Sequence, residues 1–240
     1  ISRMPNFHFA PTKICKDNIN NERPNNSLVE ITGNTVIDAL YIAKDKIEND
    51  EKINNTIKEN LNELINVKLD DTKYVLITGH RRENFGSSFI NICESIKALA
   101  ENYEDVHFIY PVHLNPNVQK PVYEILDDLS NVHLIEPQGY LEFVYLMTKC
   151  HFILTDSGGI QEEAPSLMKP VLVMRDTTER PEAIKSGGVK LVGSKKEKIV
   201  KESMKLLDSK KEYSSMCIED NPYGDGNASY RIGQIIKKSI

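Results

Sequence analysis

The strongest constraint on the fold is a regular alternation of short apolar runs with longer segments whose apolar residues recur at helical spacing. The apolar runs cover residues 73–79, 106–112, 132–137, 151–156, 170–174 and 189–192. Helices are predicted over residues 87–103, 116–129, 140–150, 158–167, 179–185, 195–208 and 211–218. Strands connected by helices run parallel and are covered on both faces. The pattern therefore predicts an α/β fold with a doubly wound, mostly parallel, Rossmann-like sheet.

The two ends of the chain are organised differently. An apolar run at residues 7–12, stopped by Pro11, is followed by an Asn- and Lys-rich segment of possible helical character and a second run at 29–32. Two amphipathic helices are predicted next, over residues 36–47 and 51–64. Near the other end, the NPYGDG segment is typical of a turn or hinge, and a last helix is predicted over residues 227–238.

Composition excludes several classes of function. The chain has 240 residues, 40% of them hydrophobic, and its net charge of −5 argues against non-specific binding to nucleic acid. No apolar segment approaches the ~20 residues that span a bilayer, and no signal-peptide pattern is present, so a cytoplasmic location without membrane insertion is expected. The cysteines lack the paired spacing of a metal site or disulfide framework. Buried or half-buried free thiols are therefore expected at Cys15, Cys93, Cys150 and Cys217.

One strand runs directly into a helix that suits an anionic ligand. Soon after the apolar residues 152–154 come Ser157, Gly158 and Gly159, where the missing glycine side chains let a ligand approach the backbone closely. The first N–H groups of a helix have no partners within it, so these groups and the Ser157 hydroxyl can bind a diphosphate.

Other polar residues also follow predicted strands. Glu162 and Glu163 lie about 100° apart around the helix, so only one of them can face a ligand bound at Ser157. A carboxylate in that place suits the two hydroxyls of a ribose. Polar residues 175–180 follow the run at 170–174, and His80 lies beside two arginines after the run at 73–79. A lone histidine is more often structural than catalytic. His80, however, is expected at the sheet edge where open α/β sheets bind ligands, which favours a role in binding an anion or the substrate.

Several motifs together resemble one family. They are TGHRRENFG at 78–86, YPVHLNPNV at 110–118, DSGGIQEEAPSL at 156–167, KPVLVMRDTTERPEA at 169–183 and NPYGDG at 221–226. In this order they closely resemble the non-hydrolysing UDP-N-acetylglucosamine 2-epimerases, and the resemblance covers nearly the whole chain.

The resemblance implies the C-terminal half of a two-domain, glycosyltransferase-B-like architecture. Members of the family carry a Rossmann-like domain ahead of the equivalent of Ile1. Residues 1–30 are then the end of that N-terminal domain, and residues 31–222 are the UDP-binding C-terminal domain. Residues 223–240 form a hinge and a helix that crosses back to the first domain.

The resemblance also assigns roles to residues. His80 is expected to contact the diphosphate and to be the catalytic residue of this chain, while Gln138 and Phe143 line the uracil pocket. Glu162 is assigned to a solvated helix face. The full substrate-binding set is His80, Gln138, Phe143, Ser157, Gly158, Gly159, Glu163 and Arg180.

A second group of residues has two interpretations. Arg81, Glu83 and His113 match positions at which relatives hold a second, activating molecule of UDP-N-acetylglucosamine. Arginine, glutamate and histidine at strand ends can equally form a structural salt-bridge network, and the sequence does not separate the two.

The implied reaction inverts C2 of UDP-N-acetylglucosamine to give UDP-N-acetylmannosamine for cell-surface polysaccharide precursors, without a cofactor or metal. The C2 proton is removed as UDP leaves, 2-acetamidoglucal forms, and UDP adds back. Two acid/base groups and stabilisation of the departing diphosphate are required. In the family the acid/base carboxylates belong to the first domain and the enzyme is a homodimer. The 240-residue chain alone is therefore expected to bind UDP weakly without epimerising the sugar.

Other functions stay open at this point. One is a nucleotide-binding half-module or subunit that holds UDP without turnover. Another is a hydrolysing epimerase that releases free N-acetylmannosamine and UDP. A glycosyltransferase of similar fold is a weaker third.

Overall fold

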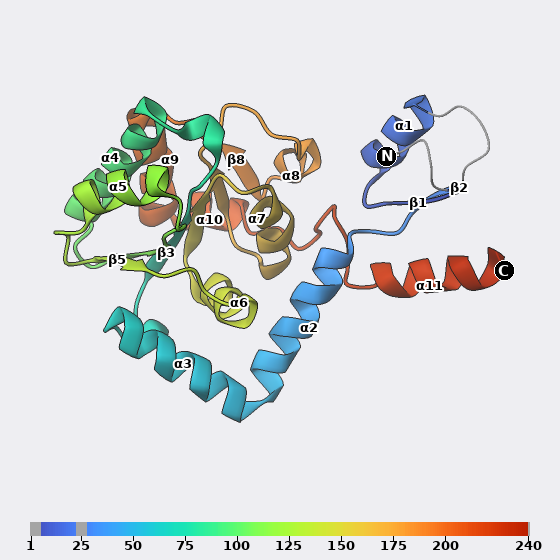
Figure 1. Ribbon diagram of the computed structural model, residues 1–240, viewed down its shortest axis with the longest axis horizontal. Helices are drawn as coiled ribbons and strands as arrows, with labels where there is room; N and C mark the ends of the chain where they lie inside the picture. Colours follow the sequence, from blue (N-terminus) through green and yellow to red (C-terminus); the bar gives the residue numbers. More distant parts are fainter. Residues whose placement is uncertain (1–5, 23–27, 240) are drawn as a thin grey trace.

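A computed structural model describes residues 6–22 and 28–239 of the chain. Its centre is a six-stranded sheet in which every neighbouring pair of strands is parallel, with strand order β5-β4-β3-β6-β7-β8. Helices lie on both sides of this sheet (Figure 1). The strands are β3 (Tyr74–Thr78), β4 (His107–Pro111), β5 (Val132–Ile135), β6 (Phe152–Thr155), β7 (Val171–Val173) and β8 (Val189–Leu191). The predicted doubly wound α/β fold is confirmed.

Two layers of helices bury the two faces of this sheet. Successive strand residues point to opposite faces, so Tyr74 and Leu76 of β3 join one core cluster while Val75 and Ile77 join the other. The first cluster includes α2 (Thr35–Asn49), α3 (Glu51–Ile65), α6 (Tyr140–Lys149) and α7 (Gly158–Glu163). The second includes α4 (Ser87–Asn102), α5 (Pro116–Leu126) and α9 (Lys196–Asp208).

Local sequence signals fix several helix boundaries. The side chains of Asn34, Asp50 and Asn115 accept hydrogen bonds from the first turns of α2, α3 and α5, respectively. The helix predicted at 158–167 is instead α7 followed by the 3-10 helix η3 (Ala164–Leu167), since Pro165 has no N–H to continue the α-helical pattern. Helix α8 (Pro181–Lys185) begins at its proline, where the missing N–H carries no cost, and not at residue 179.

Two further helices end at least three residues before the sequence-based prediction. The helix predicted over 116–129 ends at Leu126, three residues early. The helix predicted over 211–218 is α10 (Lys210–Ser215), which begins one residue earlier and ends three residues earlier. The 3-10 turns η1 (Leu69–Asp71) and η2 (Arg82–Asn84) were not predicted.

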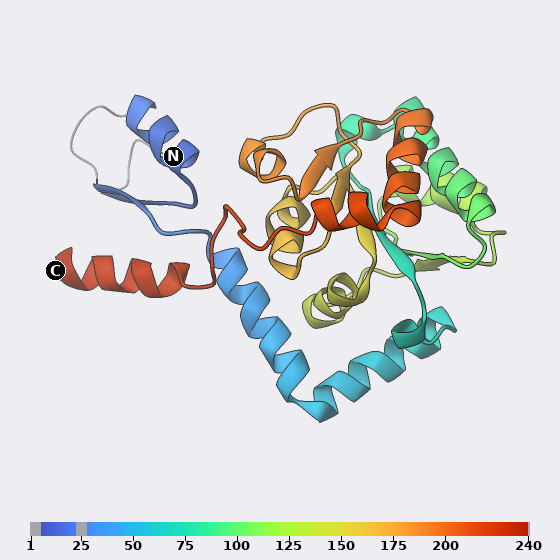
Figure 2. The ribbon, with the colours of Figure 1, turned by 180° about the vertical axis from the view of Figure 1, so that it is seen from behind.

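A small second sheet forms apart from the main one. Strands β1 (Phe7–Ala10) and β2 (Leu28–Ile31) pair in parallel, with α1 (Lys13–Glu22) between them in sequence. This unit and the last helix, α11 (Ala228–Ser239), project from the same end of the larger α/β body (Figures 1 and 2). Ile31, which was expected to begin the second domain, is the last residue of β2 and pairs with Ala10 in this small sheet. The proposed domain boundaries stay predictions.

The hinge segment meets the start of α2. The backbone N–H of Asn34 donates to the Tyr223 carbonyl at 2.7 Å. The Asp38 carboxylate accepts from the N–H groups of Ala228 (3.1 Å) and Ser229 (2.7 Å), so an α2 side chain caps the N-terminus of α11. The last helix is thereby fastened to α2 at its first turn.

Other expectations concern cysteines and membranes. Cys93 and Cys150 are buried, Cys15 and Cys217 are half-buried, and all four are free, as predicted. Within residues 6–22 and 28–239, no helix is both long and apolar enough to cross a bilayer.

Candidate functional site

The candidate site lies where the strand order reverses. Strands β4 and β5 lie on one side of β3, while β6, β7 and β8 lie on the other. In open α/β sheets, ligands bind at this switch point, beyond the carboxyl ends of the strands. The loops that leave β3 and β6 carry His80 and Ser157, so the prediction of a shared edge is confirmed.

A buried carboxylate ties these two loops together. The side chain of Asp156, directly after β6, is fully buried and accepts hydrogen bonds from three donors. These are the backbone N–H of His80 (3.0 Å), the backbone N–H of Arg81 (2.9 Å) and the side-chain amide of Asn84 (3.2 Å). The loop after β3 is therefore positioned by a side chain from the loop after β6. Asp156 had no role in the sequence-based site, although its place at a strand end was a usable signal.

A cavity of about 260 Å³ opens at this edge of the sheet. Five of the predicted functional residues line it: His80, His113, Gln138 and Ser157 from the loops after four strands, and Phe143 from α6. A larger hollow of about 650 Å³ lies between α4 and α9 and is lined by lysines and by Ala98, Val200 and Met204. Its lining also includes Glu197, Asp208 and Ser209, but no residue of the loops that follow β3, β4, β5 or β6. Because ligands of open α/β sheets bind beyond the carboxyl ends of the strands, the smaller cavity at the switch point is the better candidate.

Two histidines stack at the mouth of this cavity. The rings of His80 and His113 lie 5.3 Å apart between centroids and only 15° from parallel. His80 Nδ1 is 3.8 Å from the Asp156 carboxylate, while His80 itself is exposed. The buried Tyr110 hydroxyl donates to the Gly79 carbonyl at 2.9 Å and so fixes the backbone beneath His80. His80 is thus an accessible side chain whose backbone is held by hydrogen bonds to Asp156 and, at Gly79, from Tyr110.

Glu163 is the last residue of α7, and its side chain reaches back toward the start of the helix. A Cβ atom added to Gly159 would lie 3.8 Å from both Glu163 Oε2 and Ser157 Oγ, so both oxygens point to one side of this turn. The hydroxyl of Tyr140 donates to Glu163 Oε1 at 2.7 Å. Burial raises the pKa of the Glu163 carboxyl, and the Tyr140 hydrogen bond opposes that rise. The structure therefore places the Glu163 carboxylate and the Ser157 hydroxyl on the same side of the first turn of α7.

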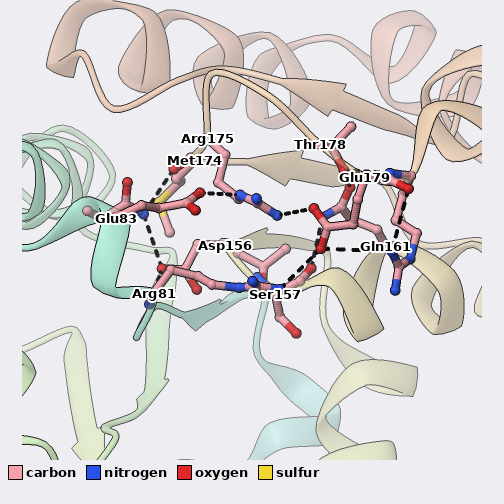
Figure 3. Close-up of polar contacts among 12 residues, drawn as sticks. Arg81, Glu83, Asp156, Ser157, Gln161, Met174, Arg175, Thr178 and Glu179 are labelled. Carbon is pink, nitrogen blue, oxygen red and sulfur yellow. Dashed lines mark hydrogen bonds and ion pairs between the residues drawn. The ribbon is translucent and has the colours of Figure 1, made fainter. Parts of the chain in front are cut away.

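A network of ion pairs surrounds the start of α7 (Figure 3). Glu179 contacts Arg81 at 3.3 Å and Arg175 at 2.8 Å, and Arg175 also contacts Glu83 at 2.5 Å. Burial alone would raise the pKa of Glu179, but its hydrogen bonds and the neighbouring arginines hold that pKa below its ordinary value. Arg81 and Glu83 therefore take part in a salt-bridge network. Arg175 and Glu179 were not assigned roles from sequence, although both belong to the polar run noted after β7.

The prediction that Glu162 faces solvent is wrong. Its side chain is buried, forms an ion pair with the Arg180 guanidinium, and accepts from the Asn34 side-chain amide at 2.6 Å. Arg180 also lies 3.8 Å from Glu179. Glu162 therefore holds Arg180 beside the site, while α7 packs against the start of α2. Asn34 and Arg180 are far from Glu162 in sequence, so helical periodicity alone gave no sign of this burial.

Gly158 lies at the centre of this network. It is buried, and a Cβ at this position would lie 2.9 Å from Glu179 Oε1, 3.3 Å from Arg81 Nη2 and 3.7 Å from Arg180 Nη2. Its φ angle is not positive, so backbone strain does not require glycine here. The requirement is for space beneath the charged side chains.

In the part of the chain that the structure describes, no group of three or more His, Cys, Asp or Glu side chains could hold a metal ion.

Comparison with known proteins gives one consistent family. The family model described as UDP-N-acetylglucosamine 2-epimerase matches residues 1–237. A UDP-N-acetylglucosamine 2-epimerase from Campylobacter jejuni is 52% identical over 238 residues, which are 99% of this chain and 62% of that protein. The chain spans about 60% of the length of the curated relatives that it matches.

Solved structures agree with this match. A UDP-GlcNAc 2-epimerase from Neisseria meningitidis bound to UDP-GlcNAc superimposes with a TM-score of 0.92 at 49% identity, covering 99% of this chain and 62% of that one. The S. aureus MnaA–UDP structure has a TM-score of 0.87 at 40% identity, covering 98% and 61% of the two chains. Both comparisons support the α/β architecture described above.

Proposed function

Because this chain belongs to the UDP-N-acetylglucosamine 2-epimerase family, we propose that it binds the UDP part of UDP-N-acetylglucosamine and takes part in the conversion to UDP-N-acetylmannosamine. The observation that carries the proposal is that His80, Phe143 and Ser157 line one cavity at the switch point, while the Glu163 carboxylate and the Ser157 hydroxyl lie on the same side of the first turn of α7. The Neisseria meningitidis relative with the same fold was solved bound to UDP-GlcNAc.

Each part of UDP has a chemically suitable partner. The Phe143 ring offers an apolar wall for the uracil base, with Gln138 beside it in the cavity lining. The Glu163 carboxylate is placed to accept hydrogen bonds from the ribose hydroxyls. Ser157 and the start of α7 offer donors to the diphosphate.

Cations complete the proposed diphosphate site. Arg81 and Arg180 both lie within 4 Å of a Cβ position at Gly158, so they can contact an anion bound over Gly158. His80 is placed at the cavity mouth, where it can donate to the departing diphosphate, and this is its proposed catalytic contact.

The reaction requires more than leaving-group stabilisation. The C2–H bond gives up its proton, its electrons form the C1–C2 double bond, and the C1–O bond breaks toward UDP; addition from the same intermediate reverses these steps with the opposite C2 configuration. Proton removal and return on opposite faces need two acid/base groups. The lining of the cavity in the described residues holds no carboxylate. The proposed contribution of this chain is therefore to hold the nucleotide and stabilise the departing charge.

The effector role of Arg81, Glu83 and His113 is a further proposal. All three belong to loops at the same edge, and His113 stacks on His80, so a second nucleotide sugar held by them would touch the substrate site. We also propose a cytoplasmic homodimer that serves cell-surface polysaccharide synthesis, on the strength of the family match.

Calorimetric titration with UDP tests the nucleotide site. Glu163→Gln should weaken UDP binding by about 1–3 kcal/mol, the contribution of hydrogen bonds to a charged group. Glu124→Gln, which changes an exposed glutamate on α5, is the matched control and should bind as the parent does. Equal affinity in parent and Glu163→Gln would rule out the ribose assignment.

Proton NMR in D₂O separates the possible reactions. With UDP-N-acetylglucosamine, growth of a UDP-N-acetylmannosamine signal with deuterium at C2 identifies epimerisation. Free N-acetylmannosamine with UDP identifies the hydrolysing reaction. UDP binding with neither product identifies a nucleotide-binding module, and absence of UDP binding contradicts the proposal as a whole.

A further inference from the structure

Tyr140 is the direct neighbour of the proposed ribose-binding carboxylate. Its hydroxyl lies 2.7 Å from Glu163 Oε1. An ionised carboxylate can only accept hydrogen bonds, so the tyrosine is the donor. Burial raises the pKa of Tyr140 well above its ordinary value, which keeps the hydroxyl protonated and able to donate.

The two residues come from different helices that meet at the cavity edge. Tyr140 is the first residue of α6, and Phe143, which lines the cavity, lies three positions later on the same side of that helix. Glu163 is the last residue of α7 and is only 7% exposed, whereas Tyr140 is 45% exposed. The tyrosine hydroxyl therefore reaches inward from the accessible edge to a buried partner.

The hydrogen bond occupies one carboxylate oxygen and leaves the other for a ligand. Oε1 takes the Tyr140 hydroxyl, while Oε2 lies on the side of Ser157 and Gly159. Without this donor, the charge of the buried carboxylate would be less well stabilised, and the group would be freer to rotate. Both changes would weaken its capacity to accept from a diol.

We propose that Tyr140 is a positioning residue that orients the Glu163 carboxylate and thereby sets the preference of this site for ribonucleoside over deoxyribonucleoside diphosphates. This inference rests on the proposed function, because it assumes that Glu163 binds the ribose. It assigns Tyr140 no contact with the reacting atoms. The ribose 2′-hydroxyl is the ligand group that reports on it.

The test compares UDP with 2′-deoxy-UDP by titration calorimetry. Tyr140→Phe keeps the ring and removes only the hydroxyl. It should weaken UDP binding by about 3- to 10-fold, the effect of one intramolecular hydrogen bond, while changing 2′-deoxy-UDP binding less. In a Glu163→Gln background, adding Tyr140→Phe should have no further effect on the ratio of the two affinities, because the group that it positions is gone.

The pH dependence gives a second readout that a merely structural role would not move. The Tyr140 hydrogen bond lowers the pKa of Glu163 against the effect of burial, so Tyr140→Phe should raise that pKa. UDP binding by the variant should therefore begin to fail at a higher pH than in the parent as the solution is acidified. The matched control is Tyr123→Phe, an exposed tyrosine on α5, which should leave both the affinities and the pH profile unchanged.

The outcomes distinguish this inference from the proposed function. If the parent binds UDP no more tightly than 2′-deoxy-UDP, or does not bind UDP, the ribose assignment itself fails. If the parent prefers UDP but Tyr140→Phe lowers both affinities equally, or changes neither, the positioning role is overturned while the nucleotide site stands. A thermal melt of Tyr140→Phe within 2 °C or so of the parent would exclude misfolding as the cause.

Discussion

Replacing Asp156 by asparagine should loosen the loop after β3 while leaving the sheet in place. The parent carboxylate is fully buried and accepts from the backbone N–H groups of His80 and Arg81 and from the Asn84 amide. An asparagine side chain has one oxygen and one NH₂ group. Its oxygen can accept only some of these three hydrogen bonds, and its NH₂ group would lie against N–H donors and accept none. The charge that strengthens the remaining bonds is also lost.

The expected cost follows from these bonds. A hydrogen bond to a charged group contributes about 1.5–3 kcal/mol and a neutral one about 0.5–1.5 kcal/mol, so weakening the two backbone bonds costs roughly 2 kcal/mol in total. Removing a buried charge offsets part of this cost. The net cost is then about 1–2 kcal/mol, which for a chain of this size corresponds to a fall of roughly 2–8 °C in the melting temperature.

Differential scanning calorimetry and UDP titration check this prediction together. UDP affinity should fall as well, because His80 and Arg81 are held in place by the lost bonds. Asp128→Asn makes the same charge change at an exposed position and should alter neither quantity. If Asp156→Asn melts at the parent temperature and binds UDP equally well, then Asp156 does not position this loop.

Two more predictions concern a glycine and a histidine. Gly158→Ala should fold normally, but calorimetric titration should show UDP binding weakened by about 1–2 kcal/mol, because the added Cβ would displace Glu179 and Arg81. The control is Gly233→Ala, whose added Cβ has no atom within 4 Å and which should bind UDP as the parent does. Burial, with a smaller effect of the adjacent His107, lowers the pKa of His133 to about 4. His133 therefore binds a proton more readily in the unfolded chain than in the folded one. As the pH drops from about 6.5 toward 4, the melting temperature should fall, and it should fall less in His133→Asn.

The sheet could be predicted from sequence because each strand has its own local signal. The apolar runs ending near Thr78 and Thr155 are short, bounded by polar or glycine residues, and separated by helices of adequate length, so their parallel arrangement follows from connectivity. Polar residues after those runs could then be assigned to one edge. The order of the strands could not, since periodicity within a run carries no information on which other run lies beside it.

The partners within the site depend on that missing information. Glu162 was assigned to solvent because helical periodicity shows only which residues share its side of the helix. Its actual partners, Asn34 and Arg180, lie outside that helix. The role of Asp156 likewise requires that β3 and β6 lie side by side. The predicted site residues that the fold brings to one cavity are mostly those in the loops that follow strands. Those missed or misjudged act through contacts made only in the folded chain.

The charges around Gly158 have a consequence for how a nucleotide would arrive. Arg81, Arg175 and Arg180 are each paired with glutamates, namely Glu83, Glu162 and Glu179, so these six side chains sum to zero formal charge. A neutral cluster on a chain of net charge −5 gives little long-range attraction for a polyanion. A diphosphate would instead be captured at short range, by exchanging places with a carboxylate that already contacts the arginines. Association should consequently be slower than electrostatically steered encounters, and its rate should depend only weakly on ionic strength.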